Sequence, residues 1–154
     1  MRLVIATVGK PKDEHLSAAI DAYESRAARY WPLDVVEVKE ASGRGVSAEL
    51  TREREGERLL DRLPRNGAVI ACDELGERLT SSQFAQLVAS ARDRASDIAF
   101  VIGGAFGLSD AVRARATRQI QLAPFTLPHE MARLVLAEQL YRAGTIVRGE
   151  PYQK

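Results

Sequence analysis

The chain has 154 residues, of which 45% are hydrophobic, and this size and composition suit one globular domain that covers residues 1–154. Its 22 basic and 21 acidic residues leave a formal net charge of +1, so no global field attracts a polyanion such as RNA, and contact with RNA must come from local patches or paired subunits. A single cysteine excludes an internal disulfide, and with only two histidines we expect no metal site.

The first half of the chain alternates between strand and helix patterns. Residues 2–8 are a β-branched apolar run, which predicts a buried strand; the run is too short for a signal peptide or a membrane span, so we expect a cytoplasmic protein. Apolar side chains three, four and seven apart predict an amphipathic helix over residues 13–30. A second strand is predicted at residues 33–38 and a charged helix at about 47–63.

The same alternation continues in the second half. AVIAC at residues 68–72 predicts a strand, followed by a polar loop, DELGER, at residues 73–78. Thr80 and Gln83 have the spacing of a capping box, which predicts that a helix begins there. Residues 97–102 predict another buried strand.

The last third begins with a glycine turn at residues 103–107, after which Ser109 is expected to cap a short helix. RQIQL then predicts a strand, and residues 130–143 predict a long helix that ends at Gly144. Strands that alternate with helices predict a single α/β domain, a parallel-rich sheet with helices on both faces.

Three predicted strand ends carry unusual sequences: residues 72–74, 102–109 and 122–129. In a parallel α/β sheet, ligands bind beyond the carboxyl ends of the strands. Glycines after a strand let a ligand approach the backbone, but the spacing here lacks both the dinucleotide fingerprint and the P-loop lysine, so a simple turn is the alternative. Pro124 and Pro128 stiffen the third segment, which is either a rigid ligand-binding loop or a plain connection. His129 is either a structural residue or a group that titrates near pH 7.

The long helix carries a wide apolar stripe, which is typical of a core or a subunit interface. Arg133 and Arg142 lie off this stripe, about two and a half turns apart, and are expected to face one side of an RNA. The final residues, TIVRGEPYQK, are either a frayed tail or a functional one that contains Tyr152.

The chain resembles the bacterial ribosomal RNA large-subunit methyltransferase H family of the SPOUT class. The resemblance rests on FVIGGAFGLS, FTLPHEMARLVLAEQLYRA and RGEPYQK, together with RLVIATVGKPK and EREGERLL, and it runs the whole length of the chain in order. It implies a homodimer with a C-terminal trefoil knot, and methylation of N3 of a pseudouridine in 23S ribosomal RNA within the assembled ribosome, with S-adenosylmethionine as the cofactor. The cofactor residues that it implies are Cys72, Gly103, Gly104, Leu122, Ala123, Pro124, Phe125, Thr126 and Leu127.

The catalytic residues expected from the resemblance are Arg142, His129 and Tyr152. Arg142 would stabilise negative charge on the uracil carbonyl oxygens as N3 loses its proton, His129 is a candidate proton acceptor, and Tyr152 would stack or close over the site. The family commonly has Tyr-His in its terminal segment, whereas this chain has Gln153 after Tyr152. Because an amide side chain does not titrate, a tail imidazole cannot be the general base here.

Two other functions are compatible with an α/β domain. A ribosome-binding or assembly factor without catalysis would need basic residues such as Arg133 and Arg148 but no cofactor turn. A nucleotide-dependent oxidoreductase would need the dinucleotide fingerprint, which the chain lacks.

Overall fold

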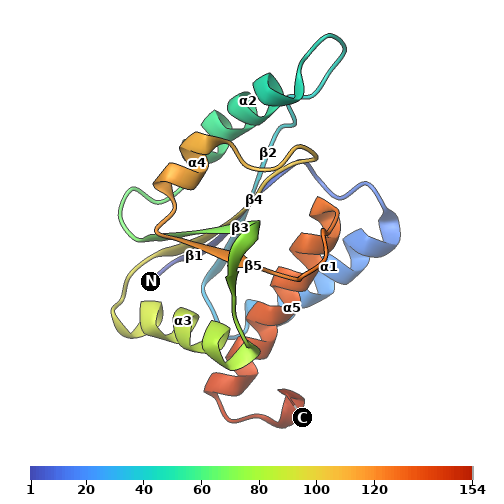
Figure 1. The fold of residues 1–154 in the computed structure, drawn as a ribbon. Coiled ribbons are helices and arrows are strands. Elements are labelled where there is room, and N and C mark those ends of the chain that lie inside the picture. The colour runs from blue at the N-terminus through green and yellow to red at the C-terminus, as the bar shows by residue number, and fades with distance from the viewer. Residues whose placement is uncertain (154) are drawn as a thin grey trace.

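All strands of the computed structural model run parallel in one sheet, in the order β2-β1-β4-β3-β5 (Figure 1). The structure describes residues 1–153. Every residue of the strands β1 and β4 is buried, because helices cover both faces of the sheet. The strands are β1 (Leu3–Val8), β2 (Leu33–Val38), β3 (Ala68–Arg78), β4 (Ile98–Ile102) and β5 (Arg118–Gln121).

Helices lie on both faces of this sheet, as the alternating sequence pattern predicts (Figure 1). On one face lie α1 (Glu14–Ala27), α3 (Ser81–Asp93) and α5 (His129–Val147); on the other lie α2 (Ala48–Leu60) and α4 (Asp110–Arg115). A short 3-10 helix, η1 (Pro151–Gln153), follows α5. The single α/β domain with a parallel sheet is therefore confirmed. The order of the strands does not define how the chain threads, so the trefoil knot stays a prediction.

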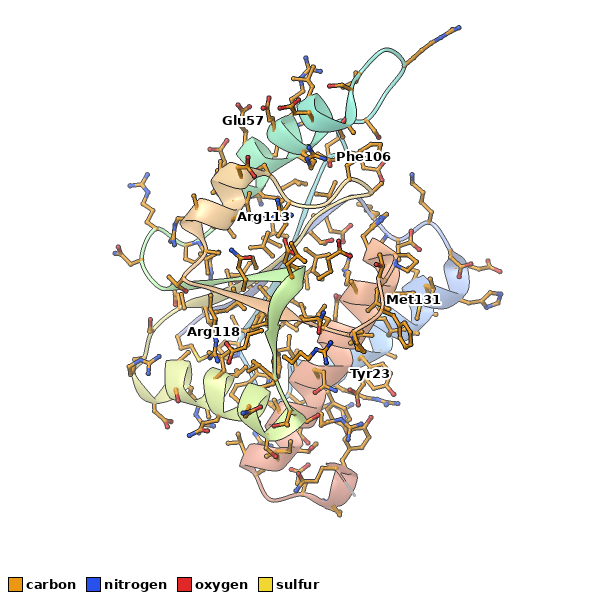
Figure 2. The ribbon with its side chains drawn as sticks, viewed as in Figure 1. Tyr23, Glu57, Phe106, Arg113, Arg118 and Met131 are labelled. Carbon is orange, nitrogen blue, oxygen red and sulfur yellow. The ribbon has the colours of Figure 1, made fainter. Side chains whose placement is uncertain are left out.

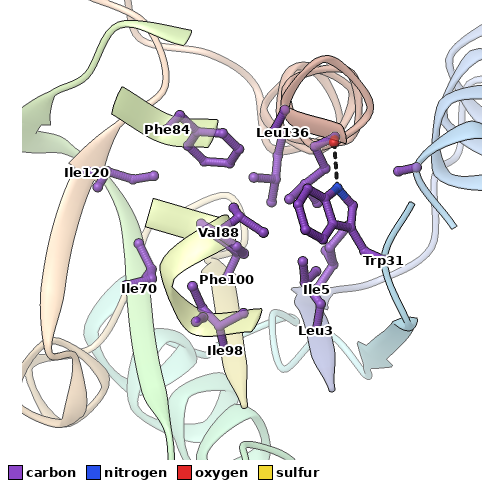
Figure 3. Close-up of a cluster of buried hydrophobic side chains, with 14 of the residues drawn as sticks. Leu3, Ile5, Trp31, Ile70, Phe84, Val88, Ile98, Phe100, Ile120 and Leu136 are labelled. Carbon is purple, nitrogen blue, oxygen red and sulfur yellow. Dashed lines mark hydrogen bonds between the residues drawn. The ribbon is translucent and has the colours of Figure 1, made fainter. Parts of the chain in front are cut away.

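Alternate residues of the central strands build two separate cores. In β1, Leu3 and Ile5 pack under α1, α3 and α5, whereas Val4 and Ala6 pack under α2 and α4. In the larger core the Trp31 indole Nε1 donates a hydrogen bond of 2.8 Å to the carbonyl oxygen of Leu140, which ties α5 to the start of β2 (Figure 3). The sheet is thus fixed from both sides, and its edges are free to carry loops.

Four helices begin at residues whose side chains accept a hydrogen bond from the backbone N–H three residues later. The predicted capping box at Thr80 and Gln83 is present, and Ser109 caps α4 as predicted. The other two caps are Asp13 for α1 and Ser47 for α2.

Two predicted boundaries are wrong. DELGER is not a loop but the second half of β3, which pairs with β5 again after an irregularity between Cys72 and Glu77. The long helix does not end at Gly144 but continues to Val147, and Gly149, with φ +69°, follows its end. Gly144 serves packing inside the helix and does not end it, because the Tyr30 ring packs where its Cβ would be. In both cases tertiary contacts override a local signal.

Arg133 is the third correction, because it is 4% exposed and does not face solvent. Its Nε lies 2.7 Å from Glu24 Oε1 and its Nη2 lies 3.5 Å from Glu37 Oε1. Nine residues correspond to two and a half turns, so Arg133 and Arg142 lie on opposite sides of α5. Arg133 is therefore a buried ion-pair residue and is not available to RNA.

Neither a membrane-spanning helix nor a metal cluster is found within residues 1–153. No helix there is long and apolar enough to cross a bilayer, and no group of three or more His, Cys, Asp or Glu side chains is arranged to hold a metal ion.

The contact between Gly144 and Tyr30 gives a stability test. A Cβ on Gly144 would lie 2.3 Å from Tyr30 Cγ, so Gly144→Ala should overpack this contact and lower the free energy of unfolding by about 1–3 kcal/mol, despite the better helix propensity of alanine. Urea unfolding measures this. Gly43→Ala is the control, because its Cβ would meet nothing closer than 3.9 Å, and we expect a change within about 0.5 kcal/mol. Equal stability of both variants would contradict the assigned packing.

Candidate functional site

A cavity of about 820 Å³ lies at the carboxyl ends of β4 and β5 and beside the irregularity of β3 that follows Cys72. Its walls come from the three strand-end segments that the sequence singles out, with Arg52 of α2, Arg113 of α4 and Ala132 of α5 completing it. Figure 2 shows Phe106 and Arg113 on the side of the molecule formed by α2 and α4, and Met131 on α5. The sheet therefore gathers the three segments into one site, as expected for parallel strands.

Most of the predicted cofactor residues line this cavity, and so does His129. Pro124 is the exception, since it is exposed and not among the lining residues. Their role toward a cofactor stays a prediction. The lining residues among those predicted are Cys72, Gly103, Gly104, Leu122, Ala123, Phe125, Thr126 and Leu127.

The glycine turn after β4 is tight. The Gly107 N–H donates a hydrogen bond of 3.0 Å to the Gly104 carbonyl, and Gly107 has φ +82°, a conformation that favours glycine. A Cβ on Gly103 would lie 2.5 Å from the Gly107 carbonyl carbon, so this glycine lets the turn fold back on itself. A Cβ on Gly104 would lie 2.8 Å from Glu55 Oε1. Packing against backbone thus requires Gly103, and the missing side chain of Gly104 leaves room for the Glu55 carboxylate, quite apart from any ligand.

Glu55 is a residue that the sequence reasoning missed. It is 3% exposed and lies on α2 between Thr51 and Leu59, which are also buried. A carboxylate at a buried position of a helix face is the signal that identifies it, because glutamate is rarely buried without a partner. Burial raises the pKa of the Glu55 carboxyl above its ordinary value.

An ion pair fixes one wall of the cavity. Arg113 Nε lies 2.8 Å from Asp73 Oδ2, and the Leu75 N–H donates to Asp73 Oδ1 at 3.0 Å. Burial opposes ionisation of Asp73, but these two donors outweigh it and hold the pKa of its carboxyl below the ordinary value. Asp73 therefore stays charged near neutral pH and keeps the Arg113 guanidinium at the wall.

The rim of the cavity is apolar and strongly exposed. Leu75 is 85% exposed, Phe125 is 80% exposed and Phe106 is 44% exposed. The loop that carries Phe125 is held by the Thr126 hydroxyl, which donates to Glu74 Oε2 at 3.0 Å. Large apolar side chains that gather at a polar opening are typical of a surface that a partner or ligand covers.

Arg142 and Tyr152 form a second cluster away from this cavity. Arg142 Nη2 lies 2.6 Å from Glu138 Oε1, and the Tyr152 hydroxyl donates to the same oxygen at 3.1 Å. The Tyr152 ring centroid lies 4.5 Å from that of Tyr141 and 4.8 Å from the Arg142 guanidinium carbon. Burial and the neighbouring Tyr23 and Glu138 raise the pKa of Tyr152, so it stays protonated. The tail through Gln153 is therefore folded against α5, and the frayed alternative is wrong for these residues.

One chain does not bring all the predicted catalytic residues together. His129 is the first residue of α5 and lies at the cavity, whereas Arg142 is thirteen residues along the same helix, about 20 Å away along its axis. Figure 1 shows the C-terminal turn at the far end of α5 from the loop that precedes this helix. The cavity and the cluster of Arg142 and Tyr152 are thus two separate places on one chain.

Comparisons with known proteins identify the family of this chain. Residues 1–153 match the family model described as predicted SPOUT methyltransferase. Two proteins named ribosomal RNA large subunit methyltransferase H are similar over nearly their whole length: that of Gemmatimonas aurantiaca is 58% identical with 100% of both chains covered, and that of Geotalea daltonii is 45% identical with 99% of both covered.

Two solved structures share the fold at low sequence identity. A probable methylase family protein from Haemophilus influenzae is 15% identical with a TM-score of 0.56, and the match covers 99% of this chain and 70% of that one. The crystal structure of a hypothetical protein is 18% identical with a TM-score of 0.52, covering 96% of this chain and 81% of that one.

The single cysteine gives a test of the cavity wall. Cys72 is half-buried, and burial together with the charge of Asp73 raises the pKa of its thiol to about 12. Very little thiolate then exists at pH 8, and although a more basic thiolate is more nucleophilic, we expect iodoacetamide to modify Cys72 about tenfold to a hundredfold more slowly than an ordinary cysteine. Mass spectrometry over time measures the rate. The urea-unfolded chain is the control, and equal rates in the folded and unfolded states would contradict the raised pKa.

Proposed function

Since the chain belongs to the SPOUT methyltransferase family, we propose that it transfers a methyl group from S-adenosylmethionine to N3 of a pseudouridine in the 23S RNA of the large ribosomal subunit. The observation that carries this proposal is the cavity beside the irregularity of β3 and the ends of β4 and β5, which unites the three predicted segments. The names of the full-length relatives support ribosomal RNA as the substrate. We also propose that the protein acts in the cytoplasm, where ribosomes are found.

The residues of the cavity fit S-adenosylmethionine. Its volume of about 820 Å³ lies within the range of small-molecule sites, and residues of the 122–127 segment and of the glycine turn line it, where an adenosine and a ribose would contact them. The buried, unpaired Glu55 oxygen beside Gly104 suits a ligand that carries positive charge. When bound, the cofactor supplies an activated methyl group on a sulfonium.

The chain's own residues then need only to orient the pseudouridine and to favour loss of its N3 proton. In this proposal Arg142 donates hydrogen bonds to the uracil carbonyl oxygens as they gain negative charge. Glu138 holds the Arg142 guanidinium through Nε at 3.0 Å, which fixes its orientation. His129 at the cavity is the candidate proton acceptor, and Gln153 contributes no titrating group.

The separation of about 20 Å along α5 supports a homodimer. A methyl group in the cavity cannot reach a base held by Arg142 of the same chain. In a two-fold pair, Arg142 and Tyr152 of one copy would lie at the cavity of the other. The exposed Leu75 and Phe125 at the rim are apolar surface that a second copy would cover.

A substitution within the cavity tests the proposed activity. Ala123 lines the cavity, so Ala123→Trp should fill the space, abolish binding of S-adenosylmethionine in calorimetry and abolish transfer of labelled methyl groups to unmethylated ribosomes. Ala114→Trp, at an exposed position on α4, is the control and should leave both unchanged. A wild-type protein that binds ribosomes but no S-adenosylmethionine would instead identify a non-catalytic ribosome-binding factor.

The shared site is tested with a second variant that lacks residues 152–154. This variant keeps the whole cavity, so we expect nearly normal affinity for S-adenosylmethionine but a strong loss of methylation, because the Tyr152 ring and the tail no longer position the base. Full activity of this variant would exclude the tail from the site.

Mixed dimers show whether the cavity and the tail of one site come from different subunits. Dimers of the truncated variant and Ala123→Trp, isolated through two affinity tags, should regain about half of the wild-type activity, because one of their two sites is intact. Inactive mixed dimers, or a monomeric mass in light scattering, would contradict a site shared between subunits.

A further inference from the structure

Glu55 has a carboxylate oxygen that no protein group satisfies among residues 1–153. Its Oε2 accepts a hydrogen bond of 3.2 Å from the Ala41 N–H, whereas Oε1 is buried and has no hydrogen-bond partner. A buried carboxylate without full pairing is costly to fold, because water no longer solvates it. The burial of such a carboxylate is explained if a bound cation offsets its negative charge.

The Glu55 carboxylate lies at an edge of the sheet where ligands commonly bind. Its Oε1 lies beside the ends of β1 and β4, next to the points where Val8 and Gly104 leave those strands. After β1 the chain continues into α1 on one face of the sheet, and after β4 it continues into α4 on the other. This divergence of neighbouring strands is where open α/β sheets bind ligands.

Gly104 connects this oxygen to the cavity, although Glu55 itself does not line it. Gly104 lines the cavity, and Glu55 Oε1 lies 2.8 Å from the place that its Cβ would occupy. A cation in the cavity beside Gly104 would therefore interact with Glu55 through protein and not through water, which leaves the attraction little screened.

Arg52 places a positive charge on the same side of α2 as Glu55. It precedes Glu55 by three residues on α2, so the two side chains lie on the same side of the helix, and Arg52 lines the cavity. Arg52 forms no ion pair within residues 1–153. Arg52 at the cavity wall and Glu55 behind Gly104 thus supply a positive and a negative group on one side of the cavity, which matches the two charges of an α-amino acid.

We propose that Glu55 and Arg52 recognise the amino-acid end of the methyl donor, with the α-ammonium beside Gly104 and Glu55, and the α-carboxylate beside Arg52. This inference rests on the proposed function and deepens it. It also orients the donor: the adenosine end lies toward residues 122–127, and the amino-acid end lies toward α2. In this arrangement the missing side chain of Gly104 lets Glu55 Oε1 lie close to the backbone that the ammonium would contact.

Three ligands that differ in their positive groups show which of these groups Glu55 binds. S-adenosylmethionine carries both an α-ammonium and a sulfonium, S-adenosylhomocysteine carries only the α-ammonium, and 5′-methylthioadenosine carries neither. Calorimetry should show that Glu55→Gln, which keeps the shape and removes the charge, weakens the first two ligands by about tenfold or more and leaves the third unchanged. Arg52→Gln should give the same pattern.

Matched controls lie on the same helix. Glu57→Gln and Arg54→Gln change exposed residues that do not line the cavity, and they should leave all three affinities as in the wild type. Because Glu55→Gln removes an unpaired buried charge, its melting temperature should be equal or higher, which separates a binding defect from misfolding.

Several outcomes would overturn the proposal. Loss of affinity for S-adenosylmethionine alone would mean that Glu55 senses the sulfonium, and equal loss for all three ligands would mean a structural role. Unchanged affinities in Glu55→Gln and Arg52→Gln, with normal binding to the wild type, would refute this inference and leave the proposed function intact. A wild-type protein that binds none of the three would refute both.

Discussion

The parallel arrangement of the strands is the constraint on which the site depends. Parallel strands place all their carboxyl ends at one edge, so segments that are distant in sequence meet there without any contact between them being specified locally. Helices cover both faces of the sheet, which leaves this edge as the place where loops can form a cavity. The burial of β1 and β4 therefore creates the platform, and the residues that follow the strands supply the chemistry.

Close packing at that edge accounts for some features that would otherwise indicate a ligand. The glycines of the turn after β4 accommodate backbone and a carboxylate of the protein itself, so a glycine there does not by itself indicate a ligand. The stronger indication is the unpaired Glu55 oxygen behind the turn, because burying a carboxylate oxygen without a hydrogen-bond partner lowers stability. The ion pair of Asp73 and Arg113 shows the opposite case, in which the protein pairs its own charges and the carboxylate remains ionised.

Much of the fold could be predicted because it follows from local patterns. The strands, the capped helices and the gathering of three strand ends all rest on periodicity and on the rules of parallel sheets. The errors arise where distant contacts decide: β5 extends the pairing of β3 through residues 73–78, Tyr30 keeps Gly144 inside a helix, and Glu24 draws Arg133 into the interior. The separation of Arg142 from the cavity is of the same kind, since only the length and direction of α5 reveal it.

The pairing of β1 has a consequence for how the chain folds during synthesis. Leu3 of β1 pairs with Ile98 of β4, so the centre of the sheet cannot close until most of the chain has left the ribosome. Until then the apolar β1 has only β2 as a strand neighbour, and one of its edges stays open to aggregation or to chaperones. Contacts this distant in sequence also slow folding. Because α5 and the tail emerge last, a prematurely terminated chain would contain a nearly complete sheet but not the helix that covers its larger core.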